Sequence, residues 1–125
     1  MQTLNGKFHY RSFCPAAGTA SNPSSIAAPW APPGQLTAST DAAGAIIGTL
    51  EFAPTVKLDV KGVVTPSTNG SPEGIDLTAE GLGATYLVRG YFGANGSIAG
   101  CVLAVKGDLG KQPPGTLGSF LLSPG

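Results

Sequence analysis

The strongest chemical signal in the sequence comes from two tyrosines and an arginine in the segment TYLVRGYF. Strand alternation places Arg89 on the same face as Tyr91 and on the opposite face from Tyr86. Both faces are otherwise apolar, so we expect this strand to be covered on both sides. A covered arginine needs a carboxylate partner, because an unpaired buried charge is very costly. Arg89 is therefore either a ligand clamp inside a barrel or a charge paired within the sheet or at a dimer interface. Its candidate partners are Asp76 and Glu80.

A second polar group lies near the N-terminus, where His9, Tyr10 and Arg11 follow one another. His9 and Arg11 share one strand face, and Tyr10 takes the other. His9 and Arg11 would suit an anion site or a general base. The alternative interpretation is a solvated outer face of an early strand.

The only tryptophan, Trp30, lies in a proline-framed segment, APWAPP, within a long loop. A loop of this length is often functional or covers an open end. Trp30 is interpreted either as a plug of one barrel end or as a wall of a ligand mouth, where its indole would form a stacking platform.

The sequence shows no catalytic or metal-binding constellation. It has no Gly-x-Ser-x-Gly elbow, and its single histidine argues against a hydrolytic triad. Cys14 and Cys101 lack the paired spacing of zinc ligands, and no glycine loop opens a helix to hold a phosphate. We therefore expect no catalytic residues, no metal and no cofactor. The two cysteines form a disulfide if their strands meet at a barrel seam, or they are two small buried thiols.

Composition favours one weakly charged domain over residues 1–125. Hydrophobic residues make up 42% of the chain and charged residues 11%, and the net charge is zero. Neutrality without a basic cluster argues against nucleic acid and anionic membranes as partners. A weakly charged exterior favours a homo-oligomer, most simply a dimer. Residues 1–7 lack a basic region followed by an apolar stretch, so a cytoplasmic location is the default expectation and a secreted mature form the alternative.

A repeated spacing of turn residue, glycine, apolar residue and glycine predicts the fold class. It occurs at Asp41–Phe52 and again at Gly93–Ala104. In each case a tight turn feeds a strand with a glycine near its start, which suits hairpins that curl into a closed β structure. No stretch shows helical spacing free of glycine and proline. The predicted strands are Lys7–Phe13, Gly34–Thr40, Ala45–Phe52, Val56–Val64, Gly74–Glu80, Ala84–Phe92, Ser97–Lys106 and Leu117–Leu122.

These elements predict an all-β fold, a small antiparallel up-and-down barrel of about eight strands with calycin- or avidin-like architecture. A β-sandwich is the alternative. A loop rich in proline, alanine and serine, at about residues 14–33, joins the first two strands. A barrel of this size has an interior just wide enough for side chains or one small ligand.

The segment Leu36–Phe52 resembles the second hairpin of the avidin and streptavidin family, in which an apolar strand, an Asp/Gly turn and a Gly-Thr strand follow in similar order. The resemblance covers under a fifth of the chain and implies a calycin-like up-and-down barrel. The tyrosine that contacts ligand in that family is Leu50 here, and Trp30 stands alone where the family has several tryptophans. Biotin binding is therefore not implied.

Three functions remain open at this point. The first is a non-enzymatic barrel that binds a hydrophobic or aromatic small molecule in its interior, which fails if inward side chains leave no cavity. The second is a structural module whose apolar surface forms an oligomer. The third is a small-barrel isomerase or cyclase, which a charged residue within an apolar pocket would favour. The ligand-binding residues predicted for the first function are Tyr10, Trp30, Tyr86, Arg89 and Tyr91.

Overall fold

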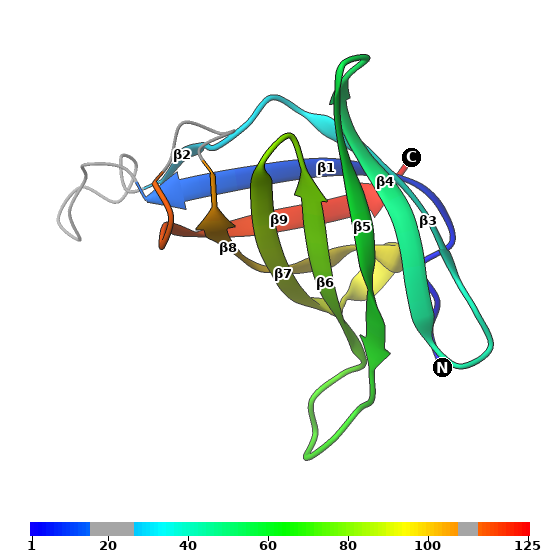
Figure 1. The fold of residues 1–125 in the computed structure, drawn as a ribbon. Helices are drawn as coiled ribbons and strands as arrows, with labels where there is room; N and C mark the ends of the chain where they lie inside the picture. The colour runs from blue at the N-terminus through cyan, green and yellow to red at the C-terminus, as the bar shows by residue number, and fades with distance from the viewer. Residues whose placement is uncertain (16–26, 108–112) are drawn as a thin grey trace, which may run out of the picture.

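The computed structural model describes residues 1–15, 27–107 and 113–125, and these form one antiparallel sheet that closes on itself (Figure 1). Eight of its nine strands make the barrel, and the short β2 pairs with the end of β1 on the same edge as β3. The strands are β1 (Gly6–Pro15), β2 (Ala27–Pro29), β3 (Gly34–Thr40), β4 (Ala45–Ala53), β5 (Val56–Thr65), β6 (Gly74–Gly81), β7 (Ala84–Phe92), β8 (Ile98–Lys106) and β9 (Leu117–Pro124).

The strands follow an up-and-down order, because each strand from β3 to β8 pairs with the next one along the chain. The barrel closes where the first strand meets the last, with Phe8 opposite Pro124 and Phe13 opposite Ser119. In Figure 1 this seam joins the blue and red ends of the chain. The expected eight-stranded barrel is therefore confirmed, and the sandwich alternative is excluded.

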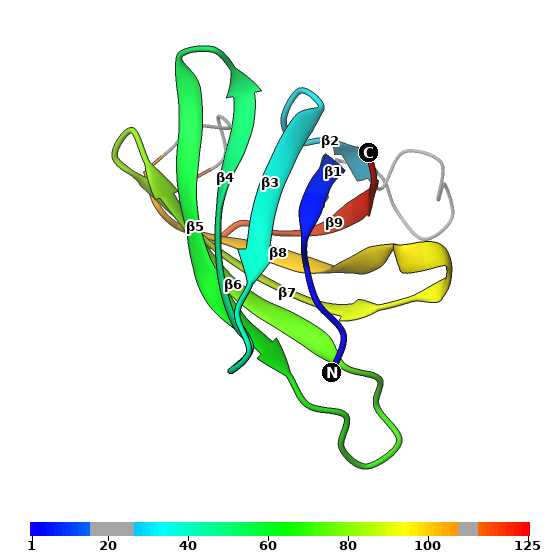
Figure 2. The ribbon, with the colours of Figure 1, turned by 90° about the vertical axis from the view of Figure 1, so that its right-hand side faces the viewer.

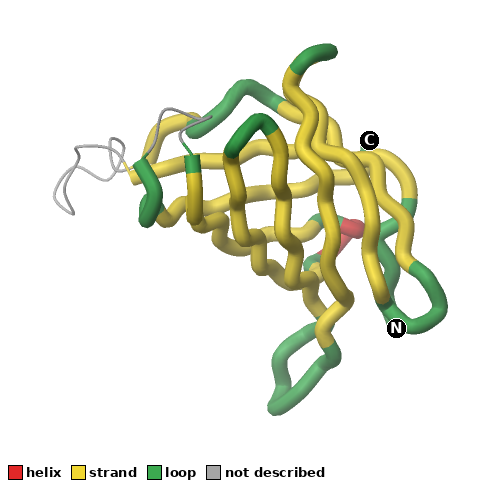
Figure 3. Tube along the Cα trace, in the orientation of Figure 1, coloured by secondary structure: helices red, strands yellow, loops and turns green. Residues whose placement is uncertain are grey.

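The predicted strand ranges agree with the observed ones to within a few residues. β2 was not predicted: it pairs with the end of β1 inside the segment interpreted as a loop at residues 14–33. Residues 16–26 of that predicted loop lie outside the described residues. The described chain has one short 3₁₀ turn, Ala94–Gly96 (Figure 3). No helix in that part of the chain is long and apolar enough to cross a bilayer.

Period-two alternation sends one face of each strand into the barrel. On β5, Leu58 and Val60 are buried, and Lys57, Asp59 and Lys61, which alternate with them, are exposed. β1 follows the same rule, with Phe8, Tyr10 and Ser12 inward and His9 and Arg11 outward. His9 and Arg11 thus lie on the solvated face that one interpretation expected.

One end of the barrel is filled by side chains and covered by the N-terminal segment, and this end faces the viewer in Figure 2. Leu4 is fully buried there and packs with the core that includes Ile46, Ile75 and Ile98. The Thr40 hydroxyl fixes this segment, because it accepts a hydrogen bond from the Leu4 amide at 2.8 Å and donates to the Leu4 carbonyl at 3.2 Å.

Glycines on inward strand positions make room for large rings. A Cβ atom at Gly90 would lie 2.7 Å from the Phe120 ring, which packs across the inner surface of β7. A Cβ at Gly118 would lie 2.7 Å from the Trp30 indole and would also meet the Phe13 carbonyl. The rings therefore pack directly on the backbone, which lets a narrow barrel hold bulky aromatic side chains.

The β3–β4 hairpin shows how a predicted turn is built. Asp41 accepts hydrogen bonds at Oδ1 from the amides of Ala43 and Ala45, both at 2.9 Å. Gly44 takes a left-handed conformation with φ of 88°, which glycine adopts without a steric penalty. The aspartate and the glycine together fix the turn, as their spacing in the sequence predicts.

The two cysteines do not form a disulfide. Cys14 is buried and Cys101 is exposed, and both are free thiols. The seam pairs β1, which carries Cys14, with β9. Cys101 is on β8, which is not adjacent to β1, so the two cysteines do not lie on neighbouring strands. The alternative of two buried thiols holds for Cys14 and is wrong for Cys101, which lies on the outward face of β8.

Candidate functional site

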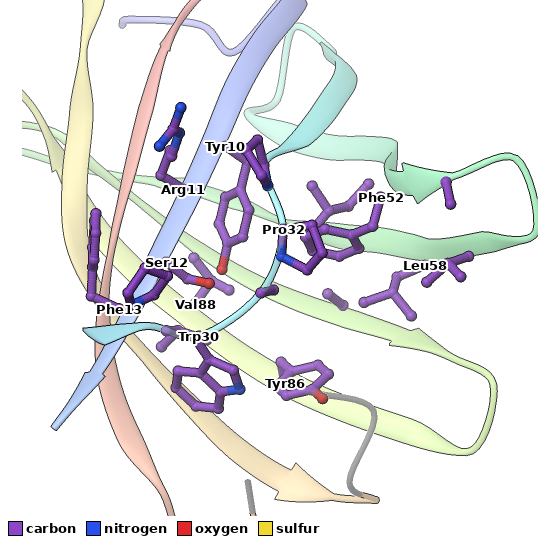
Figure 4. Close-up of a pocket in the computed structure, with 18 residues that line it drawn as sticks. Tyr10, Arg11, Ser12, Phe13, Trp30, Pro32, Phe52, Leu58, Tyr86 and Val88 are labelled. Atoms are coloured by element: carbon purple, nitrogen blue, oxygen red, sulfur yellow. The ribbon is translucent and has the colours of Figure 1, made fainter. Parts of the chain in front are cut away.

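A cavity of about 700 Å³ occupies the barrel at the end opposite Leu4, where β4 turns into β5 (Figure 4). Its walls come from six barrel strands and from the segment that follows β2. Most of its lining is apolar. The lining residues include Leu50, Phe52, Ala53, Val56, Leu58, Ala79, Val88 and Val102, together with Tyr10, Ser12, Trp30, Pro32, Pro33 and Tyr86.

Trp30 forms one wall of this cavity. The backbone amide of Trp30 donates a hydrogen bond to the Ser12 carbonyl at 2.9 Å, so the residue continues the pairing of β2 with β1. Its indole lies against Gly118 and meets the Tyr86 ring edge to face, with centroids 6.1 Å apart. Of the two interpretations of Trp30, the arrangement corresponds to the cavity wall.

Tyr10 forms the floor of the cavity. Its ring packs edge to face on Phe52, with centroids 5.9 Å apart, and stacks on Phe120 at 6.1 Å. A void of only about 20 Å³ lies beneath it, so the barrel is essentially filled below this level. The Tyr10 hydroxyl shares a hydrogen bond with the Ser12 side chain, which is itself buried.

The Tyr10 hydroxyl is in a strongly apolar environment. Burial raises the pKa of Tyr10 from its ordinary 10.0 to about 12, because the charged phenolate loses its hydration. The Ser12 hydrogen bond acts in the opposite direction, and the nearby Tyr86 raises the pKa slightly further. Tyr10 is therefore a neutral hydrogen-bonding group at any physiological pH.

The remaining two predicted site residues lie outside the barrel. Arg89 projects from the outer face of β7 and pairs there with Asp76, Nε to Oδ1 at 3.3 Å, and the arginine side chain is largely exposed. Tyr91 is 55% exposed on the same face. The expected carboxylate partner is confirmed as Asp76. In a single copy of the chain, the expectation that β7 is covered on both sides is wrong. Only the face of Tyr86 and Val88 turns into the barrel.

Three of the five predicted residues thus meet around one cavity: Tyr10, Trp30 and Tyr86. Sequence reasoning missed Phe52 and Ser12 as cavity residues. Alternation places Ser12 on the face of Tyr10 and Phe52 on the face of Leu50, but nothing in the sequence tells which residues of a face line an open end and which lie in the filled half.

The lining carries little charge. Among the described residues it contains no aspartate, glutamate, lysine or histidine. Arg11 borders the cavity, and its side chain lies on the opposite face of β1 from Tyr10 and Ser12 (Figure 4). Glu80, considered as a pocket charge, is exposed on the outer face of β6.

Comparison with known proteins gives no match: no family model, no curated protein and no solved structure is similar to this chain. The function is therefore inferred from the geometry of the barrel and its cavity.

Proposed function

We propose that this chain is a non-enzymatic β-barrel that binds a hydrophobic or aromatic small molecule in its interior. The observation that carries the proposal is the cavity of about 700 Å³ with apolar and aromatic walls. Ligand sites in proteins are typically concave, mostly apolar, and of about 300–1,000 Å³, with a few polar groups that fix orientation. A barrel filled throughout by its own side chains would have removed this proposal.

The polar inventory favours binding over the isomerase or cyclase alternative. The charged residues that would have raised that alternative, Arg89 and Glu80, both lie on the outer surface. The described lining supplies hydroxyl groups from Tyr10, Ser12 and Tyr86 but no carboxylate or imidazole to move a proton.

A fluorescence titration with phenylnaphthylamine tests the proposal, because this neutral probe brightens in apolar sites and accepts energy from Trp30. We expect the unmodified protein to bind it. Val56→Phe, which fills the cavity next to Ala53, should weaken binding at least about tenfold, or 1.4 kcal/mol. Val63→Phe is the matched control, since it makes the same change on the outer face of the same strand.

Two results would contradict the proposal: no binding by the unmodified protein, or equal binding by Val56→Phe and the unmodified protein. Circular dichroism of both variants shows whether the barrel is retained.

The outer surface favours a second proposal, that two copies of the chain associate through β7, β8 and β9. The outward residues of these strands lie in adjacent rows by register and are mostly apolar, whereas those of β5 are mostly charged. The only described ion pair on these strands joins Arg89 to Asp76. A second copy offers the apolar surface that this face needs. This outer patch consists of Leu87, Arg89, Tyr91, Ala99, Cys101, Leu103, Val105, Leu117 and Leu121.

Light scattering at micromolar concentration tests the association. We expect a dimer for the unmodified protein and a monomer for Leu117→Glu, because a charge in an apolar interface is left without a partner. Ile47→Glu is the matched control, since Ile47 is 62% exposed, against 55% for Leu117, but lies on β4, outside the patch. A monomeric unmodified protein would overturn this second proposal and leave the first intact.

A further inference from the structure

The polar groups inside the cavity share one property: none carries a charge at neutral pH. They are the hydroxyls of Tyr10, Ser12 and Tyr86 and the indole N–H of Trp30. The one formally charged lining residue in the described chain, Arg11, directs its guanidinium to the outer face (Figure 4). A ligand in the cavity therefore meets neutral dipoles and hydrocarbon.

Such a site discriminates against ions. A carboxylate or ammonium group that enters an apolar cavity loses its hydration, and only an opposite charge or several hydrogen bonds compensate for that loss. The deep part of the cavity, where Tyr10, Val88 and Ala79 form the floor, supplies no opposite charge.

The floor does supply a hydrogen-bond donor. The Tyr10 and Ser12 hydroxyls share one hydrogen bond, and both residues border the cavity. That bond uses one of their two O–H protons, so the hydroxyl pair keeps one proton to donate to a ligand. A ligand without an acceptor would leave this buried donor unsatisfied.

The walls above the floor favour a flat molecule. Trp30 and Tyr86 meet edge to face on one side of the cavity, and Phe52 lies on the other side against Tyr10 (Figure 4). Aromatic rings contribute most when they stack or meet edge to face with other rings.

We propose that the ligand is an uncharged molecule with a flat, aromatic or unsaturated body and a carbonyl-type acceptor that receives a hydrogen bond from the Tyr10–Ser12 hydroxyl pair. The body lies between the Trp30–Tyr86 pair and Phe52. This inference rests on the proposed binding function and names the chemical class that the same cavity accepts.

Calorimetric titration with acetylnaphthalene, ethylnaphthalene and naphthoate, substituted at the same ring carbon, tests the inference. The three probes have nearly the same shape and carry a carbonyl, no acceptor and a negative charge, respectively. We expect acetylnaphthalene to bind about tenfold more tightly than ethylnaphthalene, the effect of one net hydrogen bond. Naphthoate should bind at least about a hundredfold more weakly than acetylnaphthalene.

The double variant Tyr10→Phe/Ser12→Ala keeps the ring and removes both hydroxyls. In this variant acetylnaphthalene should lose its tenfold advantage, while the affinity for ethylnaphthalene stays the same and shows that the cavity is intact. Equal binding of acetylnaphthalene and ethylnaphthalene, or tight binding of naphthoate, would overturn the inference and leave the proposed binding function standing. Failure of all three probes would overturn the inference alone if phenylnaphthylamine still binds, and both proposals if it does not.

Discussion

Replacing Phe120 with alanine is expected to lower the free energy of unfolding by about 3–5 kcal/mol, the usual range for a buried phenylalanine. Phe120 is 3% exposed, stacks on Tyr10 and packs directly on the backbone at Gly90. The missing ring cannot be replaced from β7 and β8, because the positions beside it there, Gly90 and Gly100, have no side chain to move inward. Urea denaturation followed by circular dichroism measures the change.

Ile47→Ala is the control for this prediction. Ile47 lies on β4 outside the outer patch, points outward and is 62% exposed, so its truncation should change stability by less than about 1 kcal/mol. A loss of similar size in both variants would show that the inner and outer faces of the barrel are not distinct in solution.

Alkaline pH is expected to destabilise the barrel through Tyr10. Its pKa in the folded chain is about 12, above the ordinary 10.0. Between these values the unfolded chain releases the tyrosine proton and the folded chain keeps it, so the free energy of unfolding falls as the pH rises. The stability contributed by the neutral hydroxyl is fully present below pH 10.0 and declines by about 2–3 kcal/mol on approaching pH 12.

Urea denaturation at a series of alkaline pH values, with Tyr10→Phe as the reference, isolates this effect. Above pH 10.0 the unmodified protein should lose stability that the variant keeps. The difference in the free energy of unfolding between the two proteins should therefore shift in favour of the variant, compared with its value at neutral pH. A difference that stays constant across this range would contradict a buried, neutral Tyr10.

Much of the barrel could be predicted from the sequence because its strands obey simple rules. The alternation of β5 and the Asp41–Gly44 turn each specify one local conformation, and the observed hydrogen bonds at Asp41 show why. β2 could not be predicted, since it has three residues, ends in proline and is defined only by its pairing with β1. Closure of the sheet depends on a pairing between distant strands that local patterns do not encode.

The site was predictable only in part, because alternation tells which residues share a face but not which face is inside. On β7 the sequence offers apolar residues on both faces, and it marked Tyr86 and Arg89 equally as candidates. The structure turns Tyr86 inward and Arg89 outward. Trp30 gains its place in the wall from β2 and from the space that Gly118 leaves for its indole, and neither relation is visible in the sequence.

The seam between β1 and β9 has a consequence for the order of folding. The hairpins from β3 to β9 form between neighbours in the chain, whereas the pairing of Phe8 with Pro124 joins opposite ends of the sequence. Contacts between such distant residues form late, because closing the loop between them costs entropy before the contact stabilises the chain. Barrels that depend on such contacts fold in milliseconds to seconds rather than microseconds. Until that final step, β1 and β9 are open sheet edges that other chains can pair with. The period before closure is therefore the time at which this protein is most prone to aggregate.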